Sequence, residues 1–213
     1  MKEMQKKSIR EYQAIILDMD GTLYFQLPLR ICMAFSLGAY YLLHFYRLKE
    51  LFLIKKFRQL REEGRLEEAE SLADDNMKKR LEFWIYEYPL KFVRLFRDKK
   101  LVASMNALKQ KGTKIMVYSD YEPKSKIKVI GLEVDAYFYP GDTIVECLKP
   151  DPRGLKNILN KSNKAPSECL FIGDRYEKDG LCAKSVGMDY IILNRLKLFR
   201  DKSLYSMQKK GDI

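Results

Sequence analysis

Histidine and cysteine are scarce in this sequence, and their scarcity excludes whole classes of site. There is a single histidine, His44, and the four cysteines lie far apart without a CxxC pair (Cys32, Cys147, Cys169 and Cys182). A zinc site built from such residues is therefore not expected. Scattered cysteines in a chain of 213 residues fit reduced thiols in a cytoplasm better than they fit a disulfide framework.

Long hydrophobic runs are missing as well. The longest apolar stretch, residues 31–46, contains Ser36, Gly38 and His44 and falls short of the roughly 18 to 20 residues that a membrane span needs. Residues 1–13 are basic and polar, and the apolar run after them is too short to be the core of a secretory signal. We therefore expect a cytoplasmic protein.

Acidic residues are too few to balance the basic ones, which leaves a formal net charge of +11. Basic side chains gather in the middle of the chain and near its C-terminus (Arg47, Lys49, Lys55, Lys56, Arg58, Arg61, Arg195, Lys197, Arg200, Lys202, Lys209 and Lys210). Such a field attracts anionic substrates, acidic membranes or nucleic acid, and a solvated basic face explains the charge equally well. The sequence contains no nucleic-acid-binding motif, so nucleic acid is not expected as a partner.

The pattern of apolar residues changes twice along the chain. Residues 12–17 form a short apolar run followed by acids and a glycine, which is typical of a buried strand that ends in a loop. Residues 28–100 show helical spacing, and the apolar residues from Leu66 to Tyr88 predict one helix face. After residue 100, strands are expected at 114–118, 136–139, 169–172 and 189–193, and helices at 101–111, 123–130, 152–160 and 178–186.

This alternation predicts an α/β fold with a doubly wound, mostly parallel sheet that helices cover on both faces. The all-helical segment lies between the first strand and the others, so we interpret it as an insertion. The chain is accordingly divided into an α/β core of residues 1–24 and 101–194, a helical insertion of residues 25–100 and a basic C-terminal tail of residues 195–213.

The strongest chemical signal is the run Asp18-Met19-Asp20-Gly21-Thr22, which leaves the first predicted strand. Two carboxylates two residues apart can divide two roles. One attacks phosphorus, while the other gives a proton to the leaving oxygen and later takes one from water. Gly21 allows a tight turn and the close approach of a phosphate to the backbone. The run therefore predicts a phosphoryl-transfer site.

Three further elements each lie after a predicted strand, at the sheet edge where open parallel sheets bind ligands. Ser119 can donate to a phosphoryl oxygen, although such serines often only cap the next helix. Lys149 can neutralise the attacking carboxylate and the phosphate, although surface lysines are common in this chain. Asp174 and Asp179 can complete an oxygen-ligand site for Mg²⁺.

Together these elements, in this order, resemble those of the haloacid dehalogenase-like hydrolase superfamily, with its Rossmann-like core. The resemblance covers residues 12–23 and 101–193. It implies that Asp18 is the nucleophile that forms an aspartyl-phosphate and that Asp20 is the general acid and base. The segment after the first strand looks like the helical class 1 cap of that superfamily, which closes over the site and selects the substrate.

The resemblance also implies the binding groups. Ser119 and Lys149 would bind the phosphoryl group, together with the loop at Gly21. Mg²⁺ would be held by Asp18, by the backbone carbonyl of Asp20, by Asp174 and, directly or through water, by Asp179. Dehalogenases of the superfamily lack the second acid of the first motif and transport ATPases carry threonine there, so Asp20 favours phosphatases and phosphomutases.

Two positions depart from the pattern of the superfamily. Asp120 follows Ser119 where many relatives have asparagine or glycine. We count it among the phosphate-site residues, although a carboxylate there repels phosphate unless its side chain turns away. Lys178 stands where asparagine is common, and the nearby Glu177 rivals Asp179 as a metal ligand.

The first functional hypothesis is a Mg²⁺-dependent hydrolase of a small phosphorylated metabolite, and the second is a phosphomutase on the same scaffold. Arg30 and Arg47 could bind a substrate anion, whereas His44 is expected to be packed. The early insertion is unusually aromatic, which suggests a third hypothesis: an interaction module with weak catalysis that binds an anionic membrane or a protein. No feature of the sequence indicates an oligomeric state.

Overall fold

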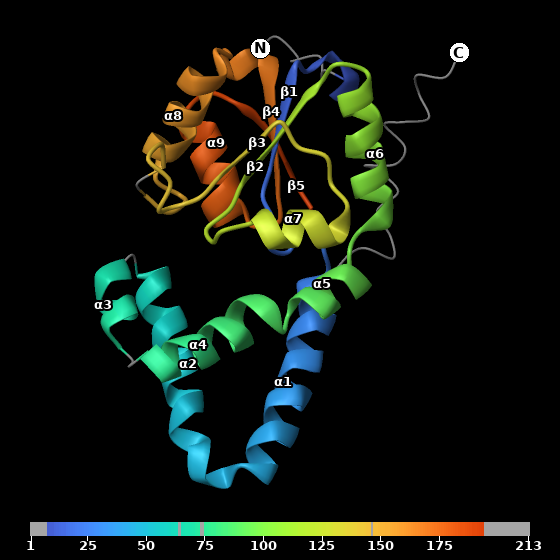
Figure 1. Cartoon of the computed structure of the whole chain (residues 1–213). Coiled ribbons are helices and arrows are strands. Elements are labelled where there is room, and N and C mark those ends of the chain that lie inside the picture. The colour runs from blue at the N-terminus through green and yellow to red at the C-terminus, as the bar shows by residue number, and fades with distance from the viewer. Residues whose placement is uncertain (1–7, 64, 73–74, 146, 194–213) are drawn as a thin grey trace.

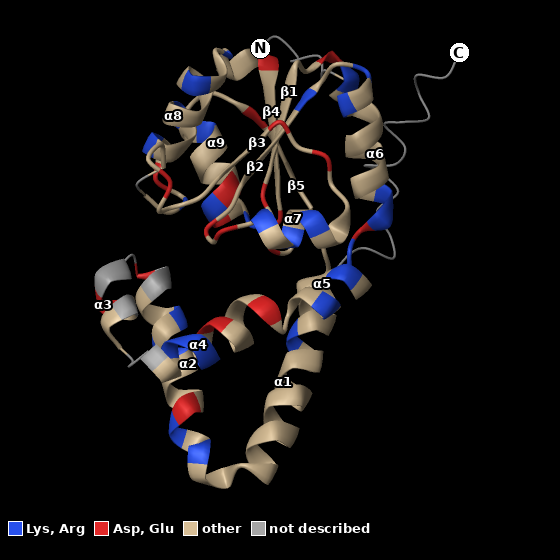
Figure 2. Cartoon of the chain, viewed as in Figure 1, with Lys and Arg blue, Asp and Glu red and all other residues tan. Residues whose placement is uncertain are grey.

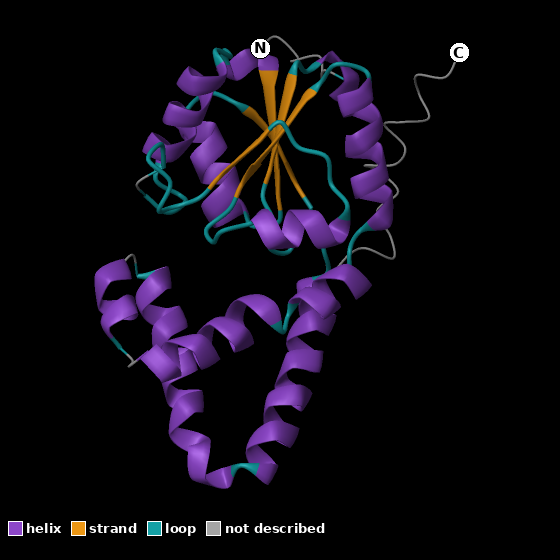
Figure 3. Ribbon diagram, viewed as in Figure 1, coloured by secondary structure: helices purple, strands orange, loops and turns teal. Residues whose placement is uncertain are grey.

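The computed structural model describes residues 8–63, 65–72, 75–145 and 147–193. Two regions are visible: a sheet with helices on both sides, and a group of helices that projects from one edge of this sheet (Figures 1 and 3). We call the second region, residues 26–95, the helical insertion. The predicted basic tail of residues 195–213 lies outside the described residues.

The described sheet has five parallel strands in the order β3-β2-β1-β4-β5. Their bounds are β1 Ala14–Leu17, β2 Lys114–Tyr118, β3 Ala136–Phe138, β4 Cys169–Gly173 and β5 Asp189–Ile192. In the central strand, Leu17 is level with Val117 of β2 and with Ile172 of β4. The predicted α/β fold is therefore confirmed, and the carboxyl ends of β1, β2 and β4 meet at one edge.

Helices cover both faces of the sheet. Strand side chains alternate between the faces, so Ile15 and Leu17 join one apolar cluster with α6 (Lys99–Gln110) and α7 (Lys124–Ile130). Ala14 and Ile16 join a second cluster with α8 (Pro152–Ser162) and α9 (Leu181–Ser185). Both faces of β1 are therefore buried, and all its side chains are apolar. Because the strand is packed on both sides, the position of Asp18, which follows it, is fixed.

The described insertion consists of helices joined by short turns, without a strand. Its elements are α1 Gln26–Leu43, η2 Phe45–Arg47, α2 Leu48–Glu62, α3 Leu66–Ser71, α4 Asp75–Glu82, the π-helical turn η3 Phe83–Glu87 and α5 Leu90–Leu95. The prediction of one helix from Leu66 to Tyr88 is wrong, because α3 ends at Ser71. The Ser71 hydroxyl donates to the Glu68 carbonyl at 3.0 Å, and such back-bonding competes with continuation of a helix.

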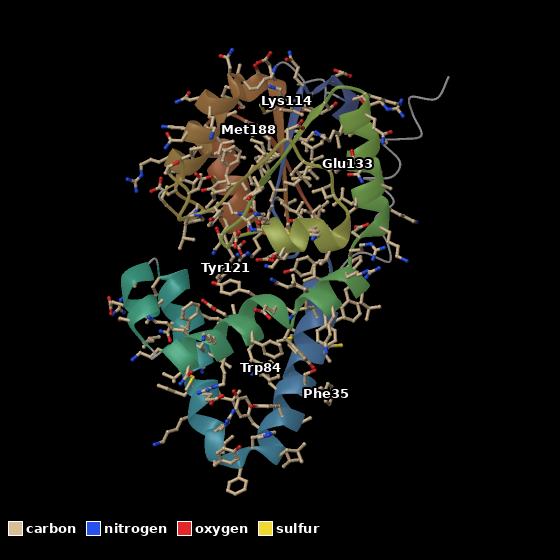
Figure 4. All side chains as sticks on the ribbon, viewed as in Figure 1. Phe35, Trp84, Lys114, Tyr121, Glu133 and Met188 are labelled. Atoms are coloured by element: carbon tan, nitrogen blue, oxygen red, sulfur yellow. The ribbon has the colours of Figure 1, made fainter. Side chains whose placement is uncertain are left out.

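None of the described helices, α1 included, is both long and apolar enough to cross a membrane. Within the insertion, Trp84 forms the centre of an aromatic cluster. Its ring centroid lies 5.2 Å from that of Tyr40 and 4.7 Å from that of Tyr88, and Figure 4 shows it between the helices. The packing of large rings therefore holds the insertion together.

The two connections between the sheet and the insertion run side by side. The Phe25 N–H donates to the Phe96 carbonyl at 2.9 Å, and the Asp98 N–H donates to the Leu23 carbonyl at 2.9 Å. The insertion also shares one apolar cluster with the α6 face of the sheet. These two hydrogen-bonded connections place the insertion below the carboxyl ends of the strands in Figure 1.

Candidate active site

Asp18 is the first residue after β1, and its carboxylate is held from two sides. Thr22 Oγ1 donates to Asp18 Oδ2 at 2.9 Å, and Lys149 Nζ donates to Asp18 Oδ1 at 2.5 Å. The turn between Asp18 and Thr22 passes through Gly21 at φ +97°, a left-handed conformation that glycine adopts without steric cost. A Cβ atom on Gly21 would collide with the Asp174 carboxylate, so this glycine also lets the loops after β1 and β4 approach each other.

Lys149 is the central cation of the site. Its side chain is 1% exposed, and Nζ donates to Asp18 at 2.5 Å, to Asp179 at 2.7 Å and to the Tyr118 carbonyl at 3.3 Å. Burial by itself lowers the pKa of a lysine, but the Asp18 and Asp179 carboxylates outweigh burial and hold the pKa of Lys149 well above its ordinary value. Lys149 therefore stays charged and offsets the two acids.

Asp18, Asp174 and Asp179 converge, since one oxygen from each lies within 4.8 Å of the others. Burial raises the pKa of Asp18 above its ordinary value and that of Asp174 to about 6; the neighbouring acids add to this effect and Lys149 opposes it. Asp174 Oδ1 is buried and has no hydrogen-bond partner within the described part of the chain. Converging hard oxygen donors of this kind fit a divalent cation.

Asp179, and not Glu177, is the second acid of this cluster. Both belong to the π-helical turn η5 (Tyr176–Gly180), in which Asp179 is buried and Glu177 is exposed. Asp179 Oδ2 accepts from the backbone N–H groups of Asp174 and Arg175 at 3.2 Å each, while Oδ1 accepts from Lys149. Because both of its oxygens have partners, a contact to an ion through water suits Asp179.

Asp20 is the second carboxylate of the loop after β1, and it has two partners that the sequence analysis does not single out. Lys126 Nζ lies 2.5 Å from Asp20 Oδ1, and the Tyr24 hydroxyl donates to the same oxygen. Burial works against ionisation of Asp20, but Lys126 and Tyr24 together outweigh it and lower the pKa of Asp20. The sequence could have indicated Lys126 by its position, because it lies in the first turn of α7, the helix that follows β2.

Ser119 follows β2 and is fully buried. Its Oγ accepts from the Tyr121 N–H at 3.2 Å, which leaves its own proton to donate to an anion. The neighbouring Asp120 turns towards Lys178, whose Nζ lies 3.0 Å from Asp120 Oδ2, and Arg175 lies 3.8 Å from the same oxygen. The two departures from the superfamily pattern, Asp120 and Lys178, are thus an ion pair.

A cleft separates the sheet edge from the insertion. Asp18, Asp20, Gln26, Arg30, Asp120, Tyr121, Leu148, Arg175 and Lys178 line its inner part. Its outer part shares Asp20, Gln26, Arg30 and Tyr121 and adds Tyr24, Leu29, Arg58, Ile85, Tyr86, Pro89 and Lys126. Figure 4 shows Tyr121 in this gap, directed towards the insertion. Arg30 therefore faces Asp18 and Asp20 from the opposite side of the cleft.

Two other candidates lie outside the lining of this cleft. The His44 ring stacks on Tyr40 with 4.3 Å between centroids, and its Nδ1 is 2.8 Å from the Tyr40 carbonyl. Arg47 Nη1 donates to the Tyr40 hydroxyl at 3.1 Å. His44 follows the last residue of α1 and Arg47 lies in η2, at the end of α1 far from the sheet, so neither is a contact of a substrate at Asp18.

Comparison with known proteins gives concordant results. A family described as haloacid dehalogenase-like hydrolase matches residues 12–187. The Rhythmically expressed gene 2 protein of Drosophila melanogaster is 33% identical over 85 residues, which are 38% of this chain and only 33% of the length of that relative.

Two solved structures illustrate the likeness of fold. One is the 2-haloacid dehalogenase of Pseudomonas syringae, with a TM-score of 0.60, 18% identity and 86% of each chain covered. The other is a HAD phosphatase of Thermococcus onnurineus, with a TM-score of 0.55, 22% identity and 86% of each chain covered. These two proteins are named for different reactions although they share the fold. The fold therefore does not distinguish the reactions, and any distinction has to come from the side chains of the site.

Proposed function

The chain belongs to the haloacid dehalogenase-like hydrolases, and we propose that it is a Mg²⁺-dependent phosphomonoester hydrolase that acts through an aspartyl-phosphate on Asp18. The main support for this proposal is that both acids of the loop after β1, Asp18 and Asp20, line one cleft. Asp18 is held by Thr22 and Lys149, and Asp20 lies two residues away with its own cation. A nucleophile and a separate proton carrier are what the two halves of ester hydrolysis require.

In the first half of the reaction, a carboxylate oxygen of Asp18 attacks phosphorus and the bond from phosphorus to the leaving oxygen breaks. Asp20 gives its proton to that leaving oxygen. The lowered pKa of Asp20 in the free protein rises when an anionic phosphate comes close. Lys149, which touches Asp18, and Ser119, which keeps its hydroxyl proton, are placed to offset the charge that develops on the phosphoryl oxygens.

In the second half, Asp20 takes a proton from water, the water oxygen attacks phosphorus, and the bond from phosphorus to Asp18 breaks to release phosphate. Asp18, Asp174 and the Asp20 backbone carbonyl would hold Mg²⁺ directly, and Asp179 would contact it through water. The bound ion would supply positive charge for the phosphoryl oxygens. The buried Asp174 oxygen without a partner in the described chain and the clustering of three acids support this assignment.

The leaving group would occupy the outer part of the cleft. That part presents the cations Arg30, Arg58 and Lys126 and the tyrosines Tyr24, Tyr86 and Tyr121. Guanidinium groups recognise carboxylate and phosphate, and tyrosines offer both a flat apolar face and a hydroxyl. We therefore expect a small phosphorylated metabolite whose leaving group carries a second acidic group or a planar ring.

The experiment that tests the proposal is hydrolysis of an aryl phosphate with a good leaving group, p-nitrophenyl phosphate, in the presence of Mg²⁺. Asp18→Asn should lower the rate by roughly 10⁴-fold or more, as expected when the nucleophile of a covalent mechanism is removed. Asp20→Asn should still release nitrophenol in a burst and then stall, because this leaving group needs little protonation but water still needs a base. A trapped phosphoryl group on Asp18 would identify the intermediate.

The matched control is Asp142→Asn, since Asp142 lies in a loop outside the cleft lining and its loss should leave the rate unchanged. Activity that persists in excess chelator would contradict the metal assignment. Release of halide from 2-haloacids would contradict phosphate chemistry. Transfer of labelled phosphate between two positions of one sugar, without net release, would replace hydrolysis by a mutase reaction.

A further inference from the structure

The outward face of α1 is apolar over its whole length. Leu27, Ile31, Phe35 and Leu42 are 60%, 48%, 76% and 80% exposed, and their spacing places them on one side of an α-helix. We call these four residues the apolar stripe. Figure 4 shows Phe35 directed away from the other helices of the insertion. Eighteen residues of helix give this face a length of about 27 Å.

The stripe continues onto the hairpin between α1 and α2. Here Leu43, Phe45, Tyr46, Leu48 and Phe52 are 53–76% exposed, and we call them the apolar tip. Monomeric proteins seldom expose a contiguous apolar surface of more than a few hundred Å² unless it binds something. None of these nine residues lines the catalytic cleft, so the proposed reaction does not explain their exposure.

Along residues 21–61, which carry this surface, the exposed charge is basic, whereas Glu82 and Glu87 are exposed acids farther along the insertion. Between Asp20 and residue 62 the only acidic residue is Glu50, which is 5% exposed and forms an ion pair with Arg80 at 3.0 Å. Lys49, Lys55 and Lys56 beside the tip are exposed. Figure 2 shows α1 almost free of charge, with basic residues along α2 and α5.

Basic residues also flank the stripe on its α5 side. Lys91 and Arg94 of α5 are exposed, and the Lys91 ammonium lies 3.7 Å from the centroid of the Tyr88 ring. Helix α5 packs against α1, so these cations lie beside the helix that carries the stripe. The apolar surface therefore has cations at its tip and along one side, and no exposed acid in residues 21–61.

We propose that the apolar stripe and tip dock onto the surface of an anionic membrane, with α1 lying in the plane of the interface. Rings and leucines would enter the boundary between headgroups and acyl chains, while the flanking lysines and arginines bind lipid phosphates. The excess of basic residues beside the stripe and tip favours an anionic bilayer over a second copy of this chain, because two such surfaces would repel each other. No described helix is long and apolar enough to span a membrane.

Cosedimentation of the whole chain with phosphatidylcholine vesicles, with and without phosphatidylserine, tests this proposal. The protein should pellet with the anionic vesicles, and high salt should weaken the binding because part of it is electrostatic. A variant with both Leu42→Ser and Phe45→Ser should partition at least about tenfold more weakly, because two large apolar side chains no longer leave water. Tyr190→Ser is the control, since Tyr190 is 36% exposed on β5, away from the insertion.

All the substituted side chains are exposed, and circular dichroism melts equal to those of the unsubstituted protein would show that the fold is kept. Asp18→Asn should bind vesicles like the unsubstituted protein, so failure of the proposed catalysis and failure of docking are separable. Absence of binding to anionic vesicles at low salt would overturn the proposal. So would a stable dimer in sedimentation velocity that the Leu42 and Phe45 substitutions dissociate without any effect of vesicles.

Discussion

The sheet edge and the helical insertion handle charge in opposite ways. At the sheet edge, Lys149 is buried between Asp18 and Asp179 at 2.5 and 2.7 Å. In the insertion, most charged groups are in water, as in the Arg65–Glu68 pair, and aromatic rings such as Trp84 fill the interior. Buried charges need specific partners, whereas apolar packing tolerates many arrangements. The first region is therefore suited to one reaction and the second to variable recognition.

The largest effect on stability is expected from Lys149→Met. Removal of this cation leaves Asp18 and Asp179 buried without their shared partner, and breaking a buried ion pair in this way costs about 3–5 kcal/mol. Catalysis should be lost as well, because nothing then offsets the charge of the nucleophile. Urea unfolding followed by circular dichroism measures the first effect and aryl phosphate hydrolysis the second.

The matched control lies in the insertion. Arg65→Met also removes the cation of an acid pair, at 2.5 Å from Glu68, but both side chains are about half exposed. The urea midpoint of this variant should not change measurably, because water screens such pairs. Equal effects of the two substitutions would contradict the distinction between the two regions.

A smaller effect is expected when the aromatic interior is opened. Trp84 is 6% exposed and contacts Tyr40 and Tyr88, so Trp84→Ala should destabilise the protein by about 3 kcal/mol or somewhat more. It should also lower kcat/KM, because Ile85 and Tyr86 of the same π-helical turn line the cleft. Phe35→Ala is the control: Phe35 is 76% exposed on α1, and its loss should cost less than about 1 kcal/mol. A Trp84 variant with unchanged stability would show that the rings do not hold the insertion together.

How much the sequence predicts also differs between the two regions. Asp18, Ser119 and Asp174 each follow an apolar strand, and parallel pairing brings such strand ends together. Short-range pattern and topology therefore suffice to place them at one edge, as the structure does. The α/β fold is predicted for the same reason.

The pairings of individual side chains could not be predicted in this way. Contact between Asp20 and Lys126 depends on where α7 begins. The pairing of Asp120 with Lys178 joins the loop after β2 to the turn η5, 58 positions away. In the insertion, periodicity predicts helix but not its interruptions, because Leu66 to Tyr88 keep an apolar spacing across the end of α3 at Ser71. Substrate recognition rests on contacts of this kind, which no local motif encodes.

Metal binding tests whether the two regions are energetically coupled. All three clustered acids belong to the sheet region, yet one apolar cluster includes residues of both regions, such as Leu17 and Trp84. Mg²⁺ at about 100 times its dissociation constant should add about 2.7 kcal/mol to stability. The single tryptophan reports on the insertion, so its fluorescence transition should shift with Mg²⁺ as much as the circular dichroism transition.

Asp174→Asn provides the control for this measurement, because it removes a carboxylate from the cluster and should abolish both shifts. A fluorescence transition that does not move with Mg²⁺, while circular dichroism does, would show that the insertion unfolds as a separate unit. The two regions would then differ in cooperativity as well as in composition.

The smallest expected effect concerns an acid at the rim of the sheet region. Asp135 accepts from Lys109 at 2.5 Å and from the Ile115 N–H at 2.8 Å. Burial opposes its ionisation, but these donors outweigh burial and lower the pKa of Asp135.

A carboxyl group with a lowered folded-state pKa stabilises the fold above its unfolded-state pKa, and this contribution is lost as the pH falls through the folded-state value. Asp135→Asn should therefore cost at most about 1 kcal/mol at neutral pH, because the Asp135 side chain is 38% exposed and water screens the pair. The deficit should begin to shrink below a pH of about 4 and vanish only below the lowered folded-state pKa. In the insertion, Glu68→Gln should show no deficit at either pH. Among the described residues, that acid accepts hydrogen bonds from the exposed Arg65 side chain and from no backbone N–H. Urea melts of both variants across this pH range would decide whether anchoring by the backbone, rather than ion pairing itself, is what makes the acids of the sheet region contribute to stability.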